Sequence, residues 1–363
     1  MAESTYIQYF LGANSPSGFY SLYDQLILPE TARGIYILKG GPGCGKSTLM
    51  RRVGRFLQEE GIPAEYILCS GDPDSLDAVV FPTLRVALVD GTAPHVVEPK
   101  YPGVVESYVN LGECYDKDAL GDLRQEIMGC MKGYKGCYQS AYRCLGAAAE
   151  IRADVRSTLL SESLIQRLTK RADGILSREI KPKKGTQTGQ VRQRFLGAIT
   201  HKGPICLYDT ALAQCTRIYE FSDRYGLAHD ALAHLLAGAV RGGYDVVACP
   251  SPMSPDRLAH LILPELSLAF LSSTPECPFS GVPYRRIRLD SMADEEILRR
   301  NRPRLRFAQK VSAALVEEAV ESLAQAKAMH DELEQLYNPH VNFDRVDQTA
   351  RRIADEILDL NLA

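Results

Sequence analysis

The sequence of 363 residues lacks several features that would assign it to a broad class of proteins. Its ten cysteines include no C-x-x-C pair, and residues 1–12 carry no basic-then-apolar targeting pattern. Its most apolar run, 258–271, is interrupted by Pro264 and Glu265 and is too short to span a bilayer. The formal net charge of −3 gives no electrostatic reason to expect a nucleic acid or an anionic membrane as a partner. We therefore expect a cytoplasmic protein with reduced cysteines and no membrane association.

Blocks of sequence recur along the chain in the same order and at a slowly drifting offset. Two of these blocks and their counterparts are Phe10-Leu-Gly-Ala13 with Phe195-Leu-Gly-Ala198, and Ile35-Tyr36 with Ile218-Tyr219. Chance does not place several such blocks in one order, so the sequence predicts two homologous halves of domain size. The boundary falls in the polar segment 181–190 and divides the chain into residues 1–185 and 186–363.

The segment from Ile35 to Met50 carries the most specific motif. A short apolar strand is followed by the glycine loop G-x-x-x-x-G-K-[ST], from Gly40 to Ser47, and then by apolar residues at helical spacing. The N–H groups of such a loop hold phosphate oxygens at the start of a helix. We expect Lys46 to reach the β- and γ-phosphates of a nucleoside triphosphate and the Ser47 hydroxyl to bind Mg²⁺. The residues expected to cradle the nucleotide are Gly40, Gly41, Pro42, Gly43, Cys44, Gly45, Lys46, Ser47 and Thr48.

Beside Lys46, three further residues of the first half are candidate catalytic groups. An apolar strand ends in Asp90, where we expect the carboxylate to hold Mg²⁺ directly or through water. Asp72 and His95 are candidates for activating a nucleophile or sensing the γ-phosphate. The alternatives are a helix cap for Asp72 and an ordinary loop residue for His95. Because Gly91 and not a glutamate follows Asp90, we expect slow hydrolysis or transfer to an acceptor other than water.

Each half is expected to fold as an α/β core followed by a helical subdomain. In the first half the elements expected after the glycine loop are strands at 64–69, 84–90 and 104–111 and a short helix at 74–81. This alternation predicts a parallel sheet with helices on both faces, similar to that of P-loop NTPases. The expected cores extend to about residues 112 and 290, and the expected helical subdomains cover about 113–180 and 291–360.

The second half has lost the residues that would bind a nucleotide. When the halves are aligned on the strand before the loop, Gly45, Lys46 and Ser47 stand opposite Ala228, His229 and Asp230. Asp90 has Ser272 as its counterpart. The carboxylate of Asp230 would complement the dipole at the start of the helix. We therefore expect Asp230 to replace the nucleotide electrostatically and the second half to bind no triphosphate.

Arginines cluster in the second half, between Arg285 and Arg306. One of them could complete the site of the first half as an arginine finger, or the cluster could contact a nucleic-acid backbone. The nearby acidic residues Asp290 and 294–296 favour a third interpretation, a solvated basic surface. We expect the two halves to pair within the chain.

The whole chain resembles a family of uncharacterised bacterial tandem P-loop ATPase-like proteins. The resemblance lies in the tandem plan, in the loop 40–48 and in the run Val89-Asp-Gly-Thr-Ala-Pro-His-Val-Val-Glu-Pro-Lys-Tyr-Pro-Gly103. It implies a nucleotide-binding α/β fold and a bacterial cytoplasmic protein. It implies no substrate.

These features predict a Mg-ATP-binding protein with slow ATPase activity, a nucleotide-competent first half and a degenerate second half. No Asn-Lys-x-Asp motif is present, which disfavours a guanine-selective GTPase. One alternative is a kinase that phosphorylates a small molecule or a nucleotide. Another is a nucleotide-gated module that binds a protein or a nucleic acid.

Overall fold

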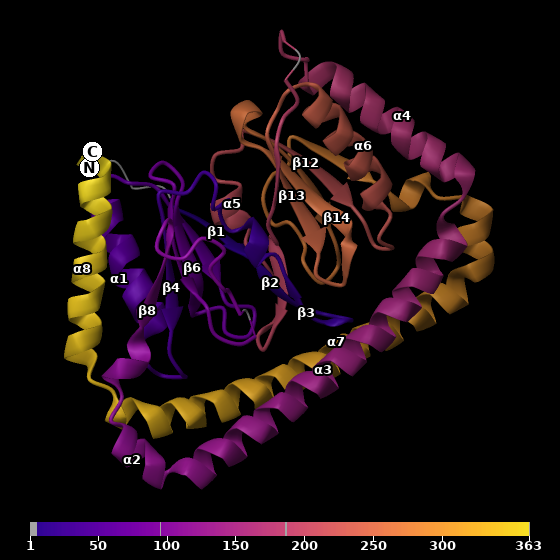
Figure 1. Ribbon diagram of the computed structural model, residues 1–363. Helices are drawn as coiled ribbons and strands as arrows, with labels where there is room; N and C mark the ends of the chain where they lie inside the picture. The colour runs from indigo at the N-terminus through magenta and orange to yellow at the C-terminus, as the bar shows by residue number, and fades with distance from the viewer. Residues whose placement is uncertain (1–5, 95, 186, 363) are drawn as a thin grey trace. The chain divides into compact units, whose positions relative to one another are not determined.

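The computed structural model of the chain describes residues 6–94, 96–185 and 187–362 (Figure 1). The protein is α/β, with two six-stranded sheets of mostly parallel strands, two short hairpins and several helices. Within the described residues, no helix combines the length and the apolarity needed to cross a bilayer.

The first sheet has the strand order β1-β5-β6-β7-β4-β8. Its strands are β1 (Tyr6–Phe10), β4 (Gly34–Lys39), β5 (Ala64–Leu68), β6 (Leu76–Phe81), β7 (Val86–Asp90) and β8 (Glu106–Asn110). β6 is antiparallel to both of its neighbours, whereas the other neighbouring pairs are parallel. The register places Leu38 of β4 beside Asp90 of β7. The carboxyl ends of these two strands therefore meet at one edge of the sheet.

The prediction of a short helix at 74–81 is wrong, and the sheet is mixed where a parallel one was expected. All six residues of β6 are buried, including the β-branched Val79 and Val80. β6 pairs with β5 and β7 through short connections, 69–75 and 82–85. A parallel crossover needs a dozen or more residues, so connections of this length permit only antiparallel neighbours.

The second sheet repeats the plan of the first, with the order β9-β13-β14-β15-β12-β16. Its strands are β9 (Val191–Gln193), β12 (Arg217–Ser222), β13 (Val246–Ser251), β14 (Ser254–Leu263), β15 (Leu268–Ser273) and β16 (Arg285–Arg288). Its antiparallel strand, β14, occupies the position that β6 has in the first sheet. The short hairpins are β2 (Gly12–Ser15) with β3 (Gly18–Ser21), and β10 (Gly197–Thr200) with β11 (Gly203–Cys206). The two sheet units are thus similar strand for strand.

The two segments expected to be helical contain long helices. The α-helices are α1 (Lys46–Glu59), α2 (Lys117–Asp122), α3 (Arg124–Leu159), α4 (Glu162–Glu179), α5 (Tyr208–Ala211), α6 (Ala228–Arg241), α7 (Glu295–Tyr337) and α8 (Phe343–Leu362). The 3₁₀ turns are η1 (Tyr23–Gln25), η2 (Leu111–Cys114), η3 (Pro264–Leu266), η4 (Asp290–Met292) and η5 (Asn338–His340).

The chain forms two compact units that are not consecutive in sequence. The first unit consists of residues up to 13, 19–141 and those from 321 onward, and the second of 14–18 and 142–320. In the first unit α8 packs on α1, and in the second α4 packs on α6. Each unit therefore takes one helix from the opposite half of the sequence. The helices α3 and α7 each contain residues of both units.

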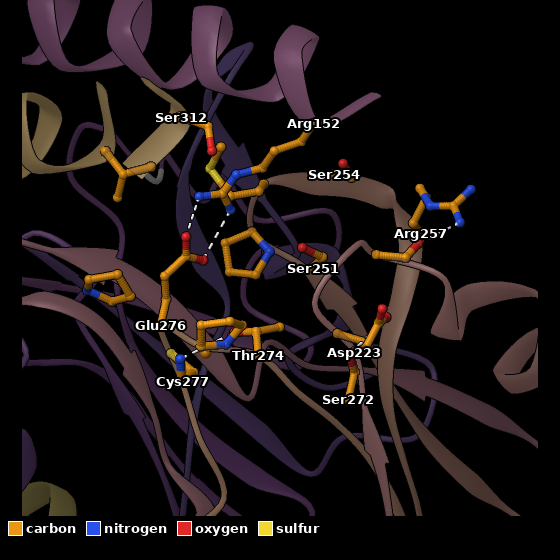
Figure 2. Close-up of a pocket in the computed structure, with 18 of the residues that line it drawn as sticks. Arg152, Asp223, Ser251, Ser254, Arg257, Ser272, Thr274, Glu276, Cys277 and Ser312 are labelled. Atoms are coloured by element: carbon orange, nitrogen blue, oxygen red, sulfur yellow. Dashed lines mark hydrogen bonds and ion pairs between the residues drawn. The ribbon is translucent and has the colours of Figure 1, made fainter. Parts of the chain in front are cut away.

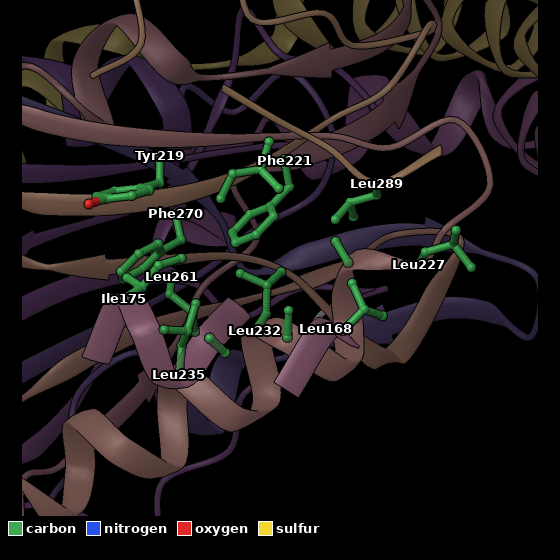
Figure 3. Packing of buried hydrophobic residues seen from close by; sticks show 14 of the residues in the cluster. Leu168, Ile175, Tyr219, Phe221, Leu227, Leu232, Leu235, Leu261, Phe270 and Leu289 are labelled. Carbon is green, nitrogen blue, oxygen red and sulfur yellow. The ribbon is translucent and has the colours of Figure 1, made fainter. Parts of the chain in front are cut away.

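Figure 3 shows how α4 and α6 cover the core of the second unit. Leu232 and Leu235 of α6 pack with Leu168 of α4 in one buried cluster, which also contains Phe221 and Phe270 of the sheet. These side chains recur at helical spacing on α4 and α6, which is the pattern of a helix that buries one face. The core of this unit thus fixes α6 and the loop that precedes it.

Candidate functional site

The segment between β4 and α1, residues 40–45, is called here the first loop. Gly43 and Gly45 have φ angles of 68° and 84°, in the left-handed region that favours glycine. α1 then begins at Lys46. Within the described residues, the backbone N–H groups of 43–48 donate to no protein acceptor. The first loop therefore presents a row of unsatisfied donors at a helix N-terminus, the arrangement that binds phosphate.

The structure brings Lys46 and Asp90 together. Lys46 Nζ donates to the carbonyl oxygens of Gly40 at 2.8 Å and Gly41 at 2.9 Å, and it lies 3.6 Å from Asp90 Oδ2. The two side chains are only 11% and 13% exposed. The other carboxylate oxygen of Asp90, Oδ1, accepts from the N–H of Thr92 at 2.8 Å and from its hydroxyl at 2.6 Å. Asp90 is thus held in one orientation with Oδ2 directed to the lysine.

Ser47 lies in the first turn of α1, and its Oγ accepts from the N–H of Leu76 at 2.9 Å. This bond joins the start of α1 to the start of β6. The hydroxyl oxygen keeps a second lone pair, which a hard cation can use. Ser47 and Asp90 share no direct hydrogen bond in the described part of the chain.

Asp72 is not a helix cap, because the segment that follows it is β6. Its carboxylate accepts from the hydroxyl of Ser75 at 2.8 Å and from the N–H of Asp74 at 3.3 Å, which closes the turn between β5 and β6. Lys327 of α7 lies 3.7 Å from Asp72 and also pairs with Asp331. Burial alone would lower the pKa of Lys327, but the hydrogen bond to Asp331 and the charge of Asp72 raise it overall. The remaining predicted catalytic residue, His95, lies outside the described residues.

The end of α7 and the turn η5 that follows it contact the first loop, which could not be predicted from the sequence. A Cβ on Gly43 would lie 2.5 Å from Asn338 Oδ1, and a Cβ on Gly41 would lie 2.9 Å from the hydroxyl of Tyr115. That hydroxyl donates to the carbonyl of Pro42 at 3.1 Å. Gly41 and Gly43 are thus required for close packing, and Gly43 also for its positive φ.

The segment 223–227, called here the second loop, connects β12 to α6 and is one residue shorter than the first loop. The buried positions of the two following helices match as Leu49, Met50, Val53 and Leu57 with Ala231, Leu232, Leu235 and Ala239. This match places Ala228 opposite Lys46 and His229 opposite Ser47. The predicted pairing of Lys46 with His229 and of Ser47 with Asp230 is therefore wrong by one residue.

A matching hydrogen bond supports the corrected alignment. His229 Nδ1 accepts from the N–H of Leu258 at 2.9 Å, as Ser47 Oγ accepts from Leu76. Leu258 on β14 corresponds to Leu76 on β6. Burial and the nearby Arg257 lower the pKa of His229, so its imidazole is neutral at neutral pH. Its proton is then on Nε2, because Nδ1 is an acceptor.

Asp223, and not Asp230, fills the second loop with a carboxylate. Its Oδ1 accepts from the N–H of Leu227 at 2.8 Å and of Tyr225 at 3.3 Å, and its Oδ2 accepts from the N–H of Ala228 at 2.8 Å. Burial raises the pKa of Asp223, and these backbone donors oppose the increase. The anion site of the second loop is therefore occupied by the protein's own side chain. The expectation that Asp230 takes this role is wrong.

A cavity of about 520 Å³ lies next to the second loop, and every residue that lines it belongs to the second unit. Figure 2 shows Arg152 facing Glu276 on one side of the cavity and Asp223 beside Ser272 on another. Arg152 binds both carboxylate oxygens of Glu276. Asp223 Oδ2 also accepts from the hydroxyl of Ser272 at 3.4 Å.

Two thiols and an imidazole also line this cavity, those of Cys206, Cys277 and His260. The contact with Cys277 lowers the pKa of the Cys206 thiol well below its usual range, against the effect of burial, and His260 lowers it further. His260 is 4% exposed, and its Nδ1 has no hydrogen-bond partner within the described chain. Its ring packs edge-on against Tyr208.

No protein-family model, curated protein or solved structure matches this chain. The resemblance to bacterial P-loop ATPase-like proteins therefore stays a prediction from the sequence.

Proposed function

We propose that the first unit binds a magnesium-complexed nucleoside triphosphate, ATP, on residues 40–48. The observation that carries the proposal is the difference between the two loops. Among the described residues, the N–H groups of 43–48 have no acceptor, whereas Asp223 accepts from N–H groups of the second loop and of Ala228. A loop that folds without a bound anion can satisfy its N–H donors with a carboxylate of its own. A loop that binds phosphate leaves these N–H donors available for the phosphate oxygens.

We also propose that both sheets have a P-loop NTPase-like fold and that the chain arose by tandem duplication. The support is the identical strand order, with one antiparallel strand at the same place in each sheet. In each unit the strand before the loop, β4 or β12, lies directly beside a parallel strand, β7 or β15. The second copy has kept the fold and exchanged Lys46 for Ala228 and Asp90 for Ser272.

The residues of the first unit suit the phosphates and the metal. Lys46, held by two carbonyl groups, has only to turn its ammonium from these neutral acceptors toward the more strongly charged β- and γ-phosphates. Ser47 and Asp90 offer hydroxyl and carboxylate oxygens, which are the ligands that Mg²⁺ prefers, and would hold the ion. When bound, Mg²⁺ neutralises charge on the transferring phosphoryl group.

Slow hydrolysis of ATP is the reaction that these groups support best. Gly91, which follows Asp90, brings no carboxylate that could orient an attacking water. Asp72 is engaged by Ser75 and lies near Lys327, so its carboxylate is not free to act as a strong base.

A nucleotide-gated binding module is the second candidate. The observation that favours it is the packing of Glu334 of α7, and of Asn338 directly after α7, against Gly43 of the first loop. A nucleotide that reshapes the loop would displace a helix that also contains residues of the second unit.

Steady-state phosphate release with Mg-ATP tests the proposed ATPase activity. We expect slow turnover that Lys46→Ala reduces by about tenfold or more, because the lysine stabilises charge on the phosphates. Lys310→Ala removes an exposed lysine of α7 and serves as the matched control, with turnover unchanged. Turnover that Lys46→Ala leaves intact would contradict the proposal. ATP binding without turnover would favour the gated module, and ADP formation only with an added acceptor would favour a kinase.

A further inference from the structure

The cavity of the second unit has the size and the walls of a small-molecule site. Ligand pockets typically enclose about 300–1,000 Å³, and this cavity encloses about 520 Å³. One wall is apolar and combines Ile151 and Val155 of α3, Ile205 of the β10–β11 hairpin and Val316 of α7. Residues of the second loop and of the start of α6 also line the cavity.

Two guanidinium groups meet at Gly226 of the second loop. Arg257 Nη2 donates to the carbonyl of Gly226 at 3.3 Å, and Arg156 Nη1 lies 3.7 Å from the point where a Cβ on Gly226 would be. The guanidinium group of Arg156 has neither a hydrogen bond nor an ion pair among the residues that the structure describes. Arg257 lies 3.8 Å from Asp230 Oδ2, and that oxygen is buried without a hydrogen-bond partner. This pair of cations is thus only loosely compensated.

The carboxylates that line the cavity do not neutralise this pair. Glu276 is bound by Arg152, and Asp223 is bound by backbone N–H groups and Ser272. Arg156 and Arg257 are both partly buried, and a partly desolvated guanidinium is stabilised by an anion that binds it. The two arginines therefore favour an anionic ligand.

Polar groups of two histidines complete the lining. His229 has its Nε2 proton available, because its Nδ1 is engaged by Leu258. His260, deeply buried, has an unpartnered Nδ1. A buried nitrogen without a hydrogen bond is unfavourable, and a polar group of a ligand in the cavity would satisfy it.

A triphosphate does not fit this chemistry. Asp223 occupies the backbone donors that would hold the β-phosphate, and Ala228 replaces the loop lysine. A single phosphate or carboxylate held by side chains does fit. We propose that the cavity of the second unit binds a small organic anion, whose phosphate or carboxylate lies between Arg156 and Arg257 and whose apolar body packs on the wall formed by α3 and α7.

Calorimetry on the full chain with four probes tests this proposal. Phenyl phosphate and phenylacetate combine an anionic group with an apolar ring. Inorganic phosphate has only the anionic group, and benzyl alcohol has the ring without the charge. We expect at least one of the two combined probes to bind once per chain and about tenfold more tightly than either single-part probe. The tighter of the two combined probes identifies the anion as phosphate or carboxylate.

Variants locate the site and separate it from the first loop. Arg156→Gln removes the cation, and Ala313→Phe fills the cavity. Each substitution is expected to weaken binding of the tighter combined probe by about tenfold. Arg304→Gln, an exposed arginine of α7 that pairs with Asp154, is the matched control and leaves binding unchanged. Lys46→Ala also leaves it unchanged, so the result does not depend on nucleotide binding by the first loop. Absence of binding by both combined probes, or binding lost in Lys46→Ala but kept in Arg156→Gln and Ala313→Phe, would overturn the proposal.

Discussion

The Asp223 carboxylate accepts a hydrogen bond from the N–H of Ala228 at 2.8 Å, at the first residue of α6. At the same place in the first unit, the N–H of Lys46 has no protein acceptor within the described residues. The two units share a strand order but differ in how they satisfy the donors at a helix N-terminus. The proposed difference in nucleotide binding between the two units rests on this relationship.

Asp223→Asn should destabilise the second unit. The substitution removes the charge that three backbone donors bind and turns an amide NH₂ toward at least one of them. Loss of such buried, charge-assisted bonds costs about 1–3 kcal/mol. The measurement is the unfolding transition in urea, with Asp256→Asn at an exposed position of β14 as the control. Equal stability of the two variants would show that Asp223 does not support the second loop.

Gly43→Ala should destabilise the folded protein more than Gly61→Ala does. Both glycines have positive φ angles, 68° and 81°, but a Cβ on Gly61 would meet nothing within 4 Å, whereas a Cβ on Gly43 would meet Asn338. The φ cost of about 1 kcal/mol is common to both, and overpacking adds about 1 kcal/mol or more at Gly43. Thermal unfolding of the two variants checks this difference, and Asn338→Ala should recover part of it. Equal shifts would mean that the end of α7 does not contact the first loop.

His229 should make the stability of the second unit depend on pH. In the folded protein its pKa is lowered, so between the unfolded value of about 6.5 and the folded value only the unfolded chain takes up the proton. Stability from this group is therefore present above about pH 6.5 and is lost as the pH falls through the folded pKa. His229→Asn keeps an acceptor for Leu258 and does not titrate. When the pH is lowered from about 7.5 to about 5.5, the free energy of unfolding measured in urea should fall further for the wild type than for the variant. An identical pH dependence would contradict this.

Division of the chain at residues 185 and 186 should not give two independently stable fragments. The first fragment lacks α8, which packs on α1, and the second lacks α4, which packs on α6. Each fragment would leave an apolar helix face uncovered. We expect the separate fragments to bind a hydrophobic dye and the co-expressed fragments to form a complex that does not. Two fragments with cooperative unfolding and no affinity for each other would refute the exchange of helices.

The sequence was sufficient to predict the features that depend on local order. The glycine loop, the start of α1 at Lys46 and the position of Asp90 at a strand end follow from spacing within a few residues. The helical character of α3, α4, α7 and α8 also follows from local pattern.

Features that depend on distant contacts could not be predicted in this way. The segment 76–81 is a buried apolar run, and only its pairing with β5 and β7 decides that it is a strand. The alignment of the two halves was wrong by one residue because the second loop is one residue shorter than the first, and nothing in the sequence marks where that residue is missing. In the sequence, nothing distinguishes Asp223 from other loop aspartates. Its role becomes visible only in the structure, where backbone N–H groups donate to its carboxylate. Likewise, the sequence contains no local signal that places Asn338 beside Gly43.

Titration calorimetry of the 363-residue chain with Mg-ATP measures directly whether the first unit binds a nucleotide. We expect one nucleotide per chain, an affinity that Lys46→Ala reduces by about tenfold or more, and no change in the Lys310→Ala control. Two nucleotides per chain, unchanged affinity in Lys46→Ala, or no heat with any magnesium-complexed purine triphosphate would contradict it.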